Sequence, residues 1–451
     1  MRIDFLREVF RERSSEDAFV FRGQGYSYAW LLDQIDSRHD RLAALAVMSH
    51  SVVMLHADFS PHAIATLLSL MERGDTILPI APSSESASED FARIAGVDFH
   101  LRLGENGEIQ AESRPSGAKH ALYRELASRG SAGLVLFSSG TTGEAKGVVH
   151  DFDRLLEKYR RRRKCYRTLA FLLFDHIGGV DTVLYSLSNG SCLVFVDERS
   201  PAGVCRAIQE HRVEVLPAAP TFLNLLFISG AWQSTDLSSL KIVTYGAEVM
   251  PEATLRRCQE MFTGVDLMQK YGTSEVGTLR SKSRSSGSLW VKIGGEGYAT
   301  RVVDGLLQIK AESSMLGYLN AESPFTSDGW FRTGDLVATD GDYIRFLGRD
   351  SDLINVGGRK VSPAEVESVI AGLPNVEEVV VFGEENALMG QVVCALVRTM
   401  EQEESRDLQR RVRAACRERL EKYKVPMKVE ATDQALTTER FKRLRAAPDE
   451  N

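Results

Sequence analysis

The chain has 451 residues, of which 43% are apolar and 26% are charged, as is typical of a soluble globular protein of two to three domains. Its formal net charge of −7 argues against non-specific binding to nucleic acid or to an anionic membrane. No apolar run approaches the roughly 18 residues that a membrane-spanning helix needs. The six cysteines form no C-x-x-C pair, which favours reduced thiols in the cytoplasm over a disulfide framework or a zinc site.

The first third of the chain predicts mixed α/β structure. Residues 1–17 carry alternating charges and predict a short amphipathic helix rather than a signal peptide. Within residues 17–137, short apolar strands such as 51–55 are followed by helical stretches such as 62–73. The serine- and acid-rich segment 83–89 predicts a loop.

From residue 168 the same alternation repeats. The predicted strands are 168–174, 191–196, 213–217 and 241–245, and the helices between them include 201–211 and 251–262. Strands that alternate with helices predict a largely parallel sheet, with ligand-binding loops at the carboxyl ends of the strands.

The residue pattern changes near residue 285, where glycines and short alternating strands (306–309, 343–347) predict a small β unit. The last hundred residues predict an α+β unit with helix 363–371, strands 376–382 and 392–397, a charged helix 405–423 and strand 425–430. We therefore predict an α/β protein with a large N-terminal domain over residues 1–350 and a small C-terminal lid domain over residues 351–451.

A loop rich in glycine, serine and threonine follows the predicted strand 133–137. Glycines let backbone N–H groups converge, hydroxyls donate further hydrogen bonds and Lys146 adds a positive charge, so the loop predicts a phosphate site. It is not the common P-loop, because Ala145 precedes the lysine and Gly147 follows it. The alternative is an ordinary polar turn. The candidate phosphate-binding residues are Ser138, Ser139, Gly140, Thr141, Thr142, Gly143 and Lys146.

Four more stretches carry chemistry-bearing side chains, namely 269–275 (QKYGTSE), 333–335 (TGD), 348–361 (GRDSDLINVGGRKV) and 438–445 (TERFKRLR). Taken singly, each also fits an ordinary structural role. Asp335 fits a turn, Glu275 fits a helix cap, and Lys442 fits a solvated basic tail.

Taken together and in this order, the five stretches resemble those of the adenylate-forming enzymes, which include acyl- and aryl-CoA synthetases, adenylation domains and luciferases. The resemblance runs from about residue 15 to about residue 446. It implies that a carboxylate attacks the α-phosphate of ATP, which gives an acyl-adenylate and pyrophosphate. A thiol then displaces AMP. The implied ligands are ATP, Mg²⁺, a small carboxylic acid and CoA, and the implied state is a monomer or homodimer.

The resemblance also implies roles for residues around the nucleotide. Thr141, Thr142, Gly143 and Lys146 would contact the β- and γ-phosphates, with Glu275 and Thr141 at Mg²⁺ and Thr273 at the α-phosphate. Gly246, Ala247 and Glu248 would flank the adenine, with Tyr271 stacked on it and Gly272 beside it. Asp335 and Arg349 would bind the ribose. Lys442 would bridge the charge that develops between the carboxylate and the α-phosphate.

The segment 173–179 (LFDHIGG) predicts the acid pocket in one of two registers. His176, followed by Gly178 and Gly179, resembles the histidine of CoA ligases beside the carboxylate. Asp175, after Phe174, resembles the aspartate that pairs with the amine in amino-acid-activating domains. A buried structural histidine is a further alternative. Other predicted wall residues are Gly179, Tyr245, Gly272, Val276 and Gly277, with Pro220 and Thr221 at the floor.

The resemblance further implies that the lid domain rotates between the two half-reactions, about a hinge at Ser351. Rotation would withdraw Lys442 and bring Gly357 and Gly358 to a thiol tunnel. Phe441 stands where the family usually has glycine, which leaves a catalytically idle nucleotide-binding subunit as an alternative. Another alternative is that the acyl group goes to the phosphopantetheine of a carrier protein. The basic run 160–164 predicts either a CoA-phosphate contact or a solvated face.

Overall fold

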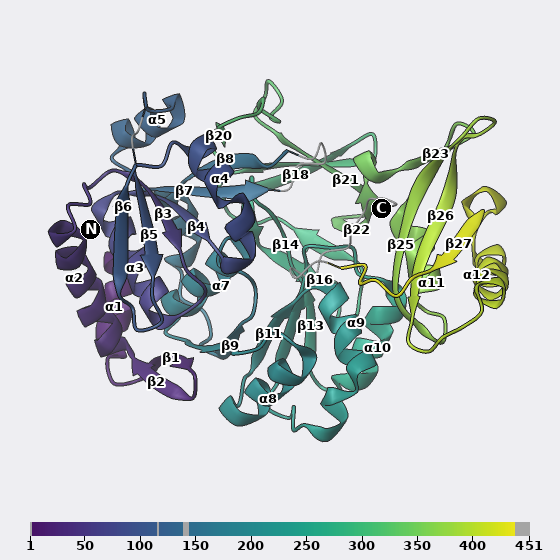
Figure 1. Cartoon of the computed structure of the whole chain (residues 1–451), viewed down its shortest axis with the longest axis horizontal. Helices are drawn as coiled ribbons and strands as arrows, with labels where there is room; N and C mark the ends of the chain where they lie inside the picture. The colour runs from purple at the N-terminus through teal and green to yellow at the C-terminus, as the bar shows by residue number, and fades with distance from the viewer. Residues whose placement is uncertain (1, 115–116, 139–143, 438–451) are drawn as a thin grey trace.

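A computed structural model describes residues 2–114, 117–138 and 144–437. These residues form a large N-terminal unit and a smaller C-terminal unit, which lies at the right in Figure 1. No helix among the described residues is both long enough and apolar enough to cross a membrane.

Two seven-stranded sheets form the centre of the N-terminal unit. In order across it, the first sheet contains β13 (Asp266–Gln269), β12 (Ile242–Tyr245), β11 (Val215–Ala218), β9 (Arg167–Ala170), β10 (Cys192–Phe195), β1 (Asp17–Phe21) and β2 (Gln24–Ser27). The second contains β20 (Gly317–Tyr318), β8 (Lys146–Asp151), β7 (Gly133–Ser138), β4 (Thr76–Ile80), β3 (Val52–His56), β5 (Phe99–Leu103) and β6 (Ile109–Ser113). The central strands of both sheets are parallel, which confirms the prediction from the strand–helix alternation.

The N-terminal unit also contains α1 (Asp4–Glu12), α2 (Tyr28–Ala44), α3 (Pro61–Arg73), η1 (Pro82–Ala87), α4 (Ser88–Ala95), α5 (Ala121–Arg129), α6 (Phe152–Leu156), η2 (Glu157–Tyr159), α7 (Ile177–Ser188), α8 (Pro201–His211), α9 (Pro220–Ser229), η3 (Ala231–Ser234) and α10 (Glu252–Met261). Local sequence explains several of their starts. The Ser60 hydroxyl caps α3 by accepting a hydrogen bond from the Ala63 N–H, and Pro61 occupies the first helical position.

The two sheets share one apolar core with the helices between them. Leu134 of β7 and Leu193 of β10 are fully buried in the same cluster as Leu68 of α3 and Val183 of α7. Because both sheets pack on one core, the loops at their strand ends keep fixed positions relative to one another.

Two predictions about local structure are wrong. Segment 83–89 lies in η1 and the start of α4 rather than in a loop, because Pro82 opens the first turn and acidic residues favour the amino end of a helix. The strand predicted over 168–174 ends at Ala170, and the apolar residues after it continue as a loop. An apolar run shows burial, but by itself it does not distinguish a strand from a buried loop.

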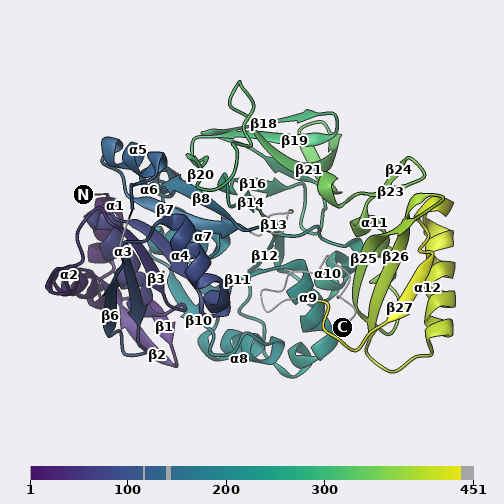
Figure 2. The ribbon, with the colours of Figure 1, turned by 45° about the horizontal axis from the view of Figure 1, so that its top comes forward.

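A small β unit lies above the two sheets in Figure 2, as predicted. Its strands, in order, are β16 (Ser281–Ser283), β17 (Val291–Ile293), β22 (Tyr343–Arg349), β21 (Phe331–Asp340), β19 (Leu306–Ala311) and β18 (Tyr298–Val303). In the sequence, β14 (Tyr271–Thr273) and β15 (Gly277–Leu279) stand between β13 of the first sheet and β16 of the small β unit. The two strands pair as an antiparallel ribbon.

The C-terminal unit has its own sheet and core. It contains η4 (Asp350–Asp352), β23 (Ile354–Val356), β24 (Arg359–Val361), α11 (Pro363–Ile370), β25 (Val376–Asn386), β26 (Gly390–Thr399), α12 (Ser405–Arg419), η5 (Lys422–Lys424) and β27 (Lys428–Ala431). α12 ends four residues before the predicted helix 405–423 does. The separate core supports the predicted boundary near residue 351, which stays a prediction.

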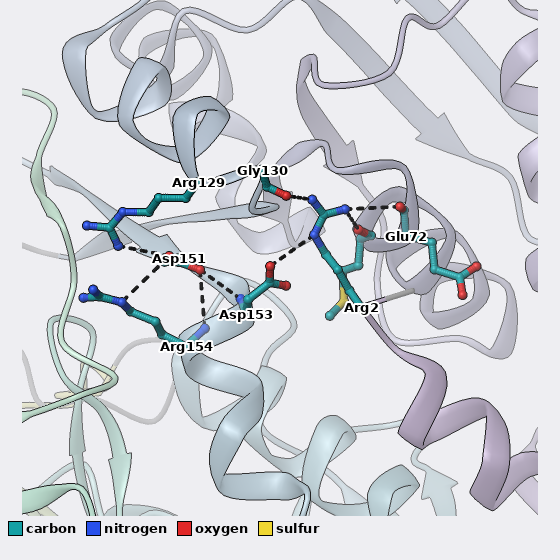
Figure 3. A network of polar contacts seen from close by, with 8 residues as sticks. Arg2, Glu72, Arg129, Gly130, Asp151, Asp153 and Arg154 are labelled. Atoms are coloured by element: carbon teal, nitrogen blue, oxygen red, sulfur yellow. Dashed lines mark hydrogen bonds and ion pairs between the residues drawn. The ribbon is translucent and has the colours of Figure 1, made fainter.

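A polar network fixes the far end of β8, the strand that begins with Lys146 (Figure 3). The Asp151 carboxylate caps α6 by accepting hydrogen bonds from backbone N–H groups of its first turn, and it lies 3.1 Å from Nη1 of Arg129. Arg2 lies 3.3 Å from the Asp153 carboxylate and thereby joins the N-terminus to the same helix. This network anchors the strand that presents the lysine.

Candidate active site

A cavity of about 2770 Å³ lies between the N-terminal unit, the small β unit and the C-terminal unit. It is larger than the roughly 300–1,000 Å³ of an ordinary small-molecule pocket. It therefore has room for a nucleotide together with a second ligand.

The cavity brings together residues from each described motif. Those of the predicted site residues that line it are Ser138, Lys146, His176, Ala247, Glu248, Gly272, Thr273, Glu275 and Arg349. Ser139, Gly140, Thr141, Thr142, Gly143 and Lys442 lie outside the described residues, and their roles stay predictions. The others are not among the described residues that line the cavity, namely Asp175, Gly179, Tyr245, Gly246, Tyr271, Val276, Gly277, Asp335, Gly357 and Gly358.

Glu275, the predicted Mg²⁺-binding carboxylate, is held by hydrogen bonds to its side chain and from its backbone. Its carboxylate accepts a hydrogen bond of 2.9 Å from the hydroxyl of Tyr318, and its backbone N–H donates to Oγ1 of Thr273 at 3.2 Å. Burial, and then the charge of Glu275, raises the pKa of Tyr318, so the phenol stays a donor. Tyr318 lines the cavity, but it lies in no stretch that the sequence singled out.

The donor set around Glu275 fits Mg²⁺ bound together with phosphates. No cluster of three or more His, Cys, Asp or Glu side chains suited to a metal ion occurs in residues 2–114, 117–138 and 144–437. Mg²⁺ commonly binds through only one or two carboxylates plus substrate phosphates. The Glu275 carboxylate is therefore sufficient for the predicted Mg²⁺ site.

Lys146 begins β8, directly opposite Ser138 of β7. Its ammonium lies 5.5 Å from the centre of the Tyr318 ring, within the range of a cation–π contact. On the same strand, the ring of the fully buried His150 is hydrogen-bonded to the backbone carbonyl of Ser274. β8 thus joins Lys146 to the turn that carries Glu275.

Asp335 and Arg349 lie on opposing positions of β21 and β22. The Asp335 carboxylate accepts a hydrogen bond of 2.6 Å from the Tyr271 hydroxyl and lies 3.2 Å from Nε of Arg349. Burial raises the pKa of Asp335, and the Arg349 guanidinium opposes that shift. The Tyr271 ring is buried and stacks on Phe346 at 4.8 Å, so its predicted stacking on adenine stays a prediction.

Glu248 lines the cavity from the loop after β12. Its carboxylate accepts hydrogen bonds from the Thr221 hydroxyl, at 2.6 Å, and from the Thr221 backbone N–H, at 3.3 Å. Thr221 was predicted at the floor of the acid pocket, and in the structure it orients this carboxylate.

The structure separates the two registers of the predicted acid pocket. His176 precedes α7 and lines the cavity, together with Gly178. The neighbouring Asp175 is buried, and its carboxylate accepts a hydrogen bond from the hydroxyl of Ser84 in η1. This geometry favours the register in which His176 faces the acid.

Gly179 is closely packed in the structure, and its role as a wall residue of the acid pocket stays a prediction. A Cβ atom at this position would lie 1.9 Å from the backbone oxygen of Leu173. The first turn of α7 therefore rests directly on the loop that precedes it, and only glycine allows this approach.

We expect a Gly179→Ala variant to lose about 3 kcal/mol of unfolding free energy, because that is the upper end of the cost of overpacking. Gly178→Ala is the matched control, since its Cβ would meet only the end of the Leu172 side chain, at 3.1 Å. Urea denaturation of both variants measures the difference. Equal stability of the two variants would contradict the packing role of Gly179.

The two glycines predicted to line a thiol tunnel, Gly357 and Gly358, are not among the described residues that line the cavity. Gly357 and Gly358 form the turn between β23 and β24, where the Gly357 N–H donates to the Met389 carbonyl at 2.8 Å. The tunnel and the hinge at Ser351 stay predictions. The last described residues, Leu436 and Thr437, are both hydrogen-bonded to the Glu378 carboxylate.

The basic run 160–164 shows the contacts of a solvated face. Arg160 pairs with Glu157, and Arg162 pairs with Glu12. Two of the basic side chains in the run are thus paired with exposed carboxylates of the protein. A contact of the run with CoA phosphate stays a prediction.

Residues 6–290 match the family model of the AMP-binding enzymes, and residues 365–442 match that of the AMP-binding enzyme C-terminal domain. Among similar proteins, indoleacetate–CoA ligase of Aromatoleum aromaticum is 27% identical over 85% of each chain. The 2-succinylbenzoate–CoA ligase of Enterococcus faecalis is 24% identical over 94% of this chain and 93% of the relative.

Among solved structures, an anthranilate CoA ligase in complex with anthranoyl-AMP superimposes with a TM-score of 0.83. It is 21% identical and covers 98% of this chain and 95% of its own. An amide bond synthetase from Marinactinospora thermotolerans superimposes with a TM-score of 0.75, at 22% identity over 98% and 97% of the two chains. Both comparisons show the shared fold of a large N-terminal and a small C-terminal unit.

Proposed function

The chain belongs to the AMP-binding enzyme family, and on that premise we propose that it is an AMP-forming acid–thiol ligase acting on a small carboxylic acid, ATP and CoA. The observation that carries the proposal is the convergence of Lys146, Glu275 and His176 on one cavity. They come from different motifs and supply a cation, a carboxylate and an imidazole. The relatives named as CoA ligases support CoA as the acceptor.

In the first half-reaction, an oxygen of the substrate carboxylate attacks the α-phosphorus of ATP. An O–P bond forms to the acid, and the bond to the β-phosphate oxygen breaks, which releases pyrophosphate. Such a displacement depends on positioning and on charge stabilisation of phosphate oxygens rather than on covalent help from the protein. Lys146 binds the departing phosphates, and Thr273 contacts the α-phosphate. When bound, Mg²⁺ at Glu275 supplies further positive charge to the same oxygens.

The nucleoside and the acid occupy the remaining walls of the cavity. Asp335 accepts hydrogen bonds from the ribose hydroxyls, and Arg349 donates to the ribose. His176 faces the carboxylate of the acid, at the amino end of α7. Lys442 bridges the developing charge between the acid and the α-phosphate.

In the second half-reaction, the thiol sulfur attacks the acyl carbon, a C–S bond forms, the thiol proton is released, and AMP leaves with the electrons of the broken C–O bond. A lid rotation about Ser351 separates the two steps, since they need different groups at one adenylate. Transfer to the phosphopantetheine of a carrier protein is the second candidate. The structural likeness to an amide bond synthetase adds an amine acceptor to the test.

The test is pyrophosphate release from ATP and Mg²⁺ over a panel of aryl, fatty and amino acids, with and without CoA. We expect sustained release with one acid class only when CoA is present, together with formation of the acyl-CoA. A single slow turnover that CoA does not accelerate would move the proposal to a carrier protein or an amine. No release with any acid would support the idle nucleotide-binding subunit.

A further inference from the structure

Residues 315–320, which we name the clamp segment, contact both of the charged residues proposed to hold the phosphates and Mg²⁺. The segment contains β20, which pairs with β8 of the second sheet. At one end, the Met315 N–H donates to the backbone carbonyl of Glu275 at 2.7 Å. At the other end, the segment reaches the residues on either side of Lys146.

The side chain of Asn320 holds the backbone on both sides of Lys146. Its amide nitrogen donates to the Ala145 carbonyl at 2.9 Å, and its amide oxygen accepts from the Gly147 N–H at 3.0 Å. The Leu319 N–H also donates to the Gly147 carbonyl at 2.8 Å. Ala145 and Asn320 are 175 positions apart in the sequence, so these bonds fix the backbone on both sides of Lys146 by a tertiary contact.

Tyr318 lies between the two charged side chains. Its hydroxyl donates to Oε1 of Glu275 at 2.9 Å, and its ring lies 5.5 Å from the ammonium of Lys146. A carboxylate has two oxygens, so a donor on one of them leaves the other able to bind a cation. The hydroxyl therefore orients Glu275 without excluding a metal ion from it.

Apolar packing keeps the clamp segment in place. Leu316 and Leu319 pack on the core cluster that contains Phe137 and Val149. A Cβ at Gly147 would meet the end of the Leu319 side chain at 3.0 Å and the Phe137 ring at 3.3 Å, so the start of β8 lies close against both. The polar contacts are thus made from a rigid base, as preorganised sites require.

We propose that Tyr318 and Asn320 are positioning residues that set Lys146 and Glu275 in place before ATP and Mg²⁺ bind. This inference rests on the proposed function. Tyr318 acts on the metal-binding carboxylate, and Asn320 acts on the phosphate-binding lysine. The two residues therefore affect different parts of the bound Mg²⁺–ATP. Mutation of residues that orient metal ligands in this way typically lowers metal affinity by about 10–100-fold.

Isothermal titration calorimetry of ATP binding to the full chain, with Mg²⁺ and then with EDTA, separates the two roles. We expect Tyr318→Phe to weaken binding about tenfold with Mg²⁺, the effect of losing one hydrogen bond to a charged group. The phenylalanine keeps the ring beside Lys146, so binding in EDTA stays at the wild-type value. Asn320→Ala is expected to weaken binding about tenfold in both conditions, because it releases two hydrogen bonds next to the lysine.

Tyr185→Phe is the matched control, since Tyr185 lies on α7 with 45% of its surface exposed. Thermal melting of each variant without ligand tests folding independently, and Tyr318→Phe should melt like the wild type.

Equal affinity of Tyr318→Phe and wild type for ATP with Mg²⁺, or equal weakening in EDTA, would overturn the role of Tyr318. Weakening by Asn320→Ala only in Mg²⁺ would overturn that of Asn320. Failure of the wild type itself to bind ATP would refute the proposed function, and this inference with it.

Discussion

A Glu275→Gln variant is expected to form the acyl-adenylate on the order of 10²-fold more slowly than the wild type, as expected for loss of preorganised charge stabilisation at the reacting phosphates. Glutamine keeps the shape of the side chain, and its amide oxygen can still accept the Tyr318 hydroxyl. The substitution therefore removes the negative charge and leaves the local packing intact. The rate of acid-dependent exchange between pyrophosphate and ATP measures the effect.

Glu260→Gln is the control for this substitution, because Glu260 is exposed on α10. It should exchange at the wild-type rate. If Glu275→Gln also keeps the wild-type rate and the wild-type dependence on Mg²⁺, Glu275 is not the metal-binding carboxylate.

The second large effect is expected from Lys442→Ala, which should slow adenylation by about 10²–10³-fold, the usual cost of removing one charge-stabilising donor. The rate of the thioester step, in contrast, should hardly change. Preformed acyl-adenylate mixed with CoA should give thioester at nearly the wild-type rate, because the proposed lid rotation withdraws this lysine before the thiol attacks.

Arg443→Ala, at the adjacent position, tests whether the tail acts only through its overall basic charge. In that case the two variants would be slowed equally. A loss below about tenfold for Lys442→Ala would also contradict its proposed role. Phe441, in place of the glycine usual in the family, does not change the expectation, since it leaves the charge of Lys442 in place.

Local sequence patterns predicted much of the fold. The pairing of serine with proline at residues 200–201 places the start of α8, where Ser200 caps the Gly203 N–H. The alternation of strands and helices predicted parallel sheets. It did not show that β1 pairs with β10 of the first sheet, because a pairing between such distant segments leaves no signal in local periodicity.

Contiguous motifs predicted several of the candidate site residues. Lys146, Glu275 and Arg349 all line the cavity. Tyr318 and Asn320 were missed, because their contacts arise only when β20 pairs with β8.

Gly179 was assigned to the pocket because it follows His176 in a motif. In the structure, Gly179 lies in the first turn of α7, where a Cβ would lie 1.9 Å from the backbone oxygen of Leu173. A motif therefore specifies neighbours in sequence, while burial decides which of them face a ligand.

Exchange of labelled pyrophosphate into ATP by the wild-type chain, with each acid of the panel and without CoA, tests adenylate formation itself. We expect exchange that requires the acid, requires Mg²⁺ and proceeds without a thiol, because adenylate formation is reversible and precedes thiol attack. Absence of exchange with every acid, in a chain that binds ATP, would contradict the proposed adenylate formation.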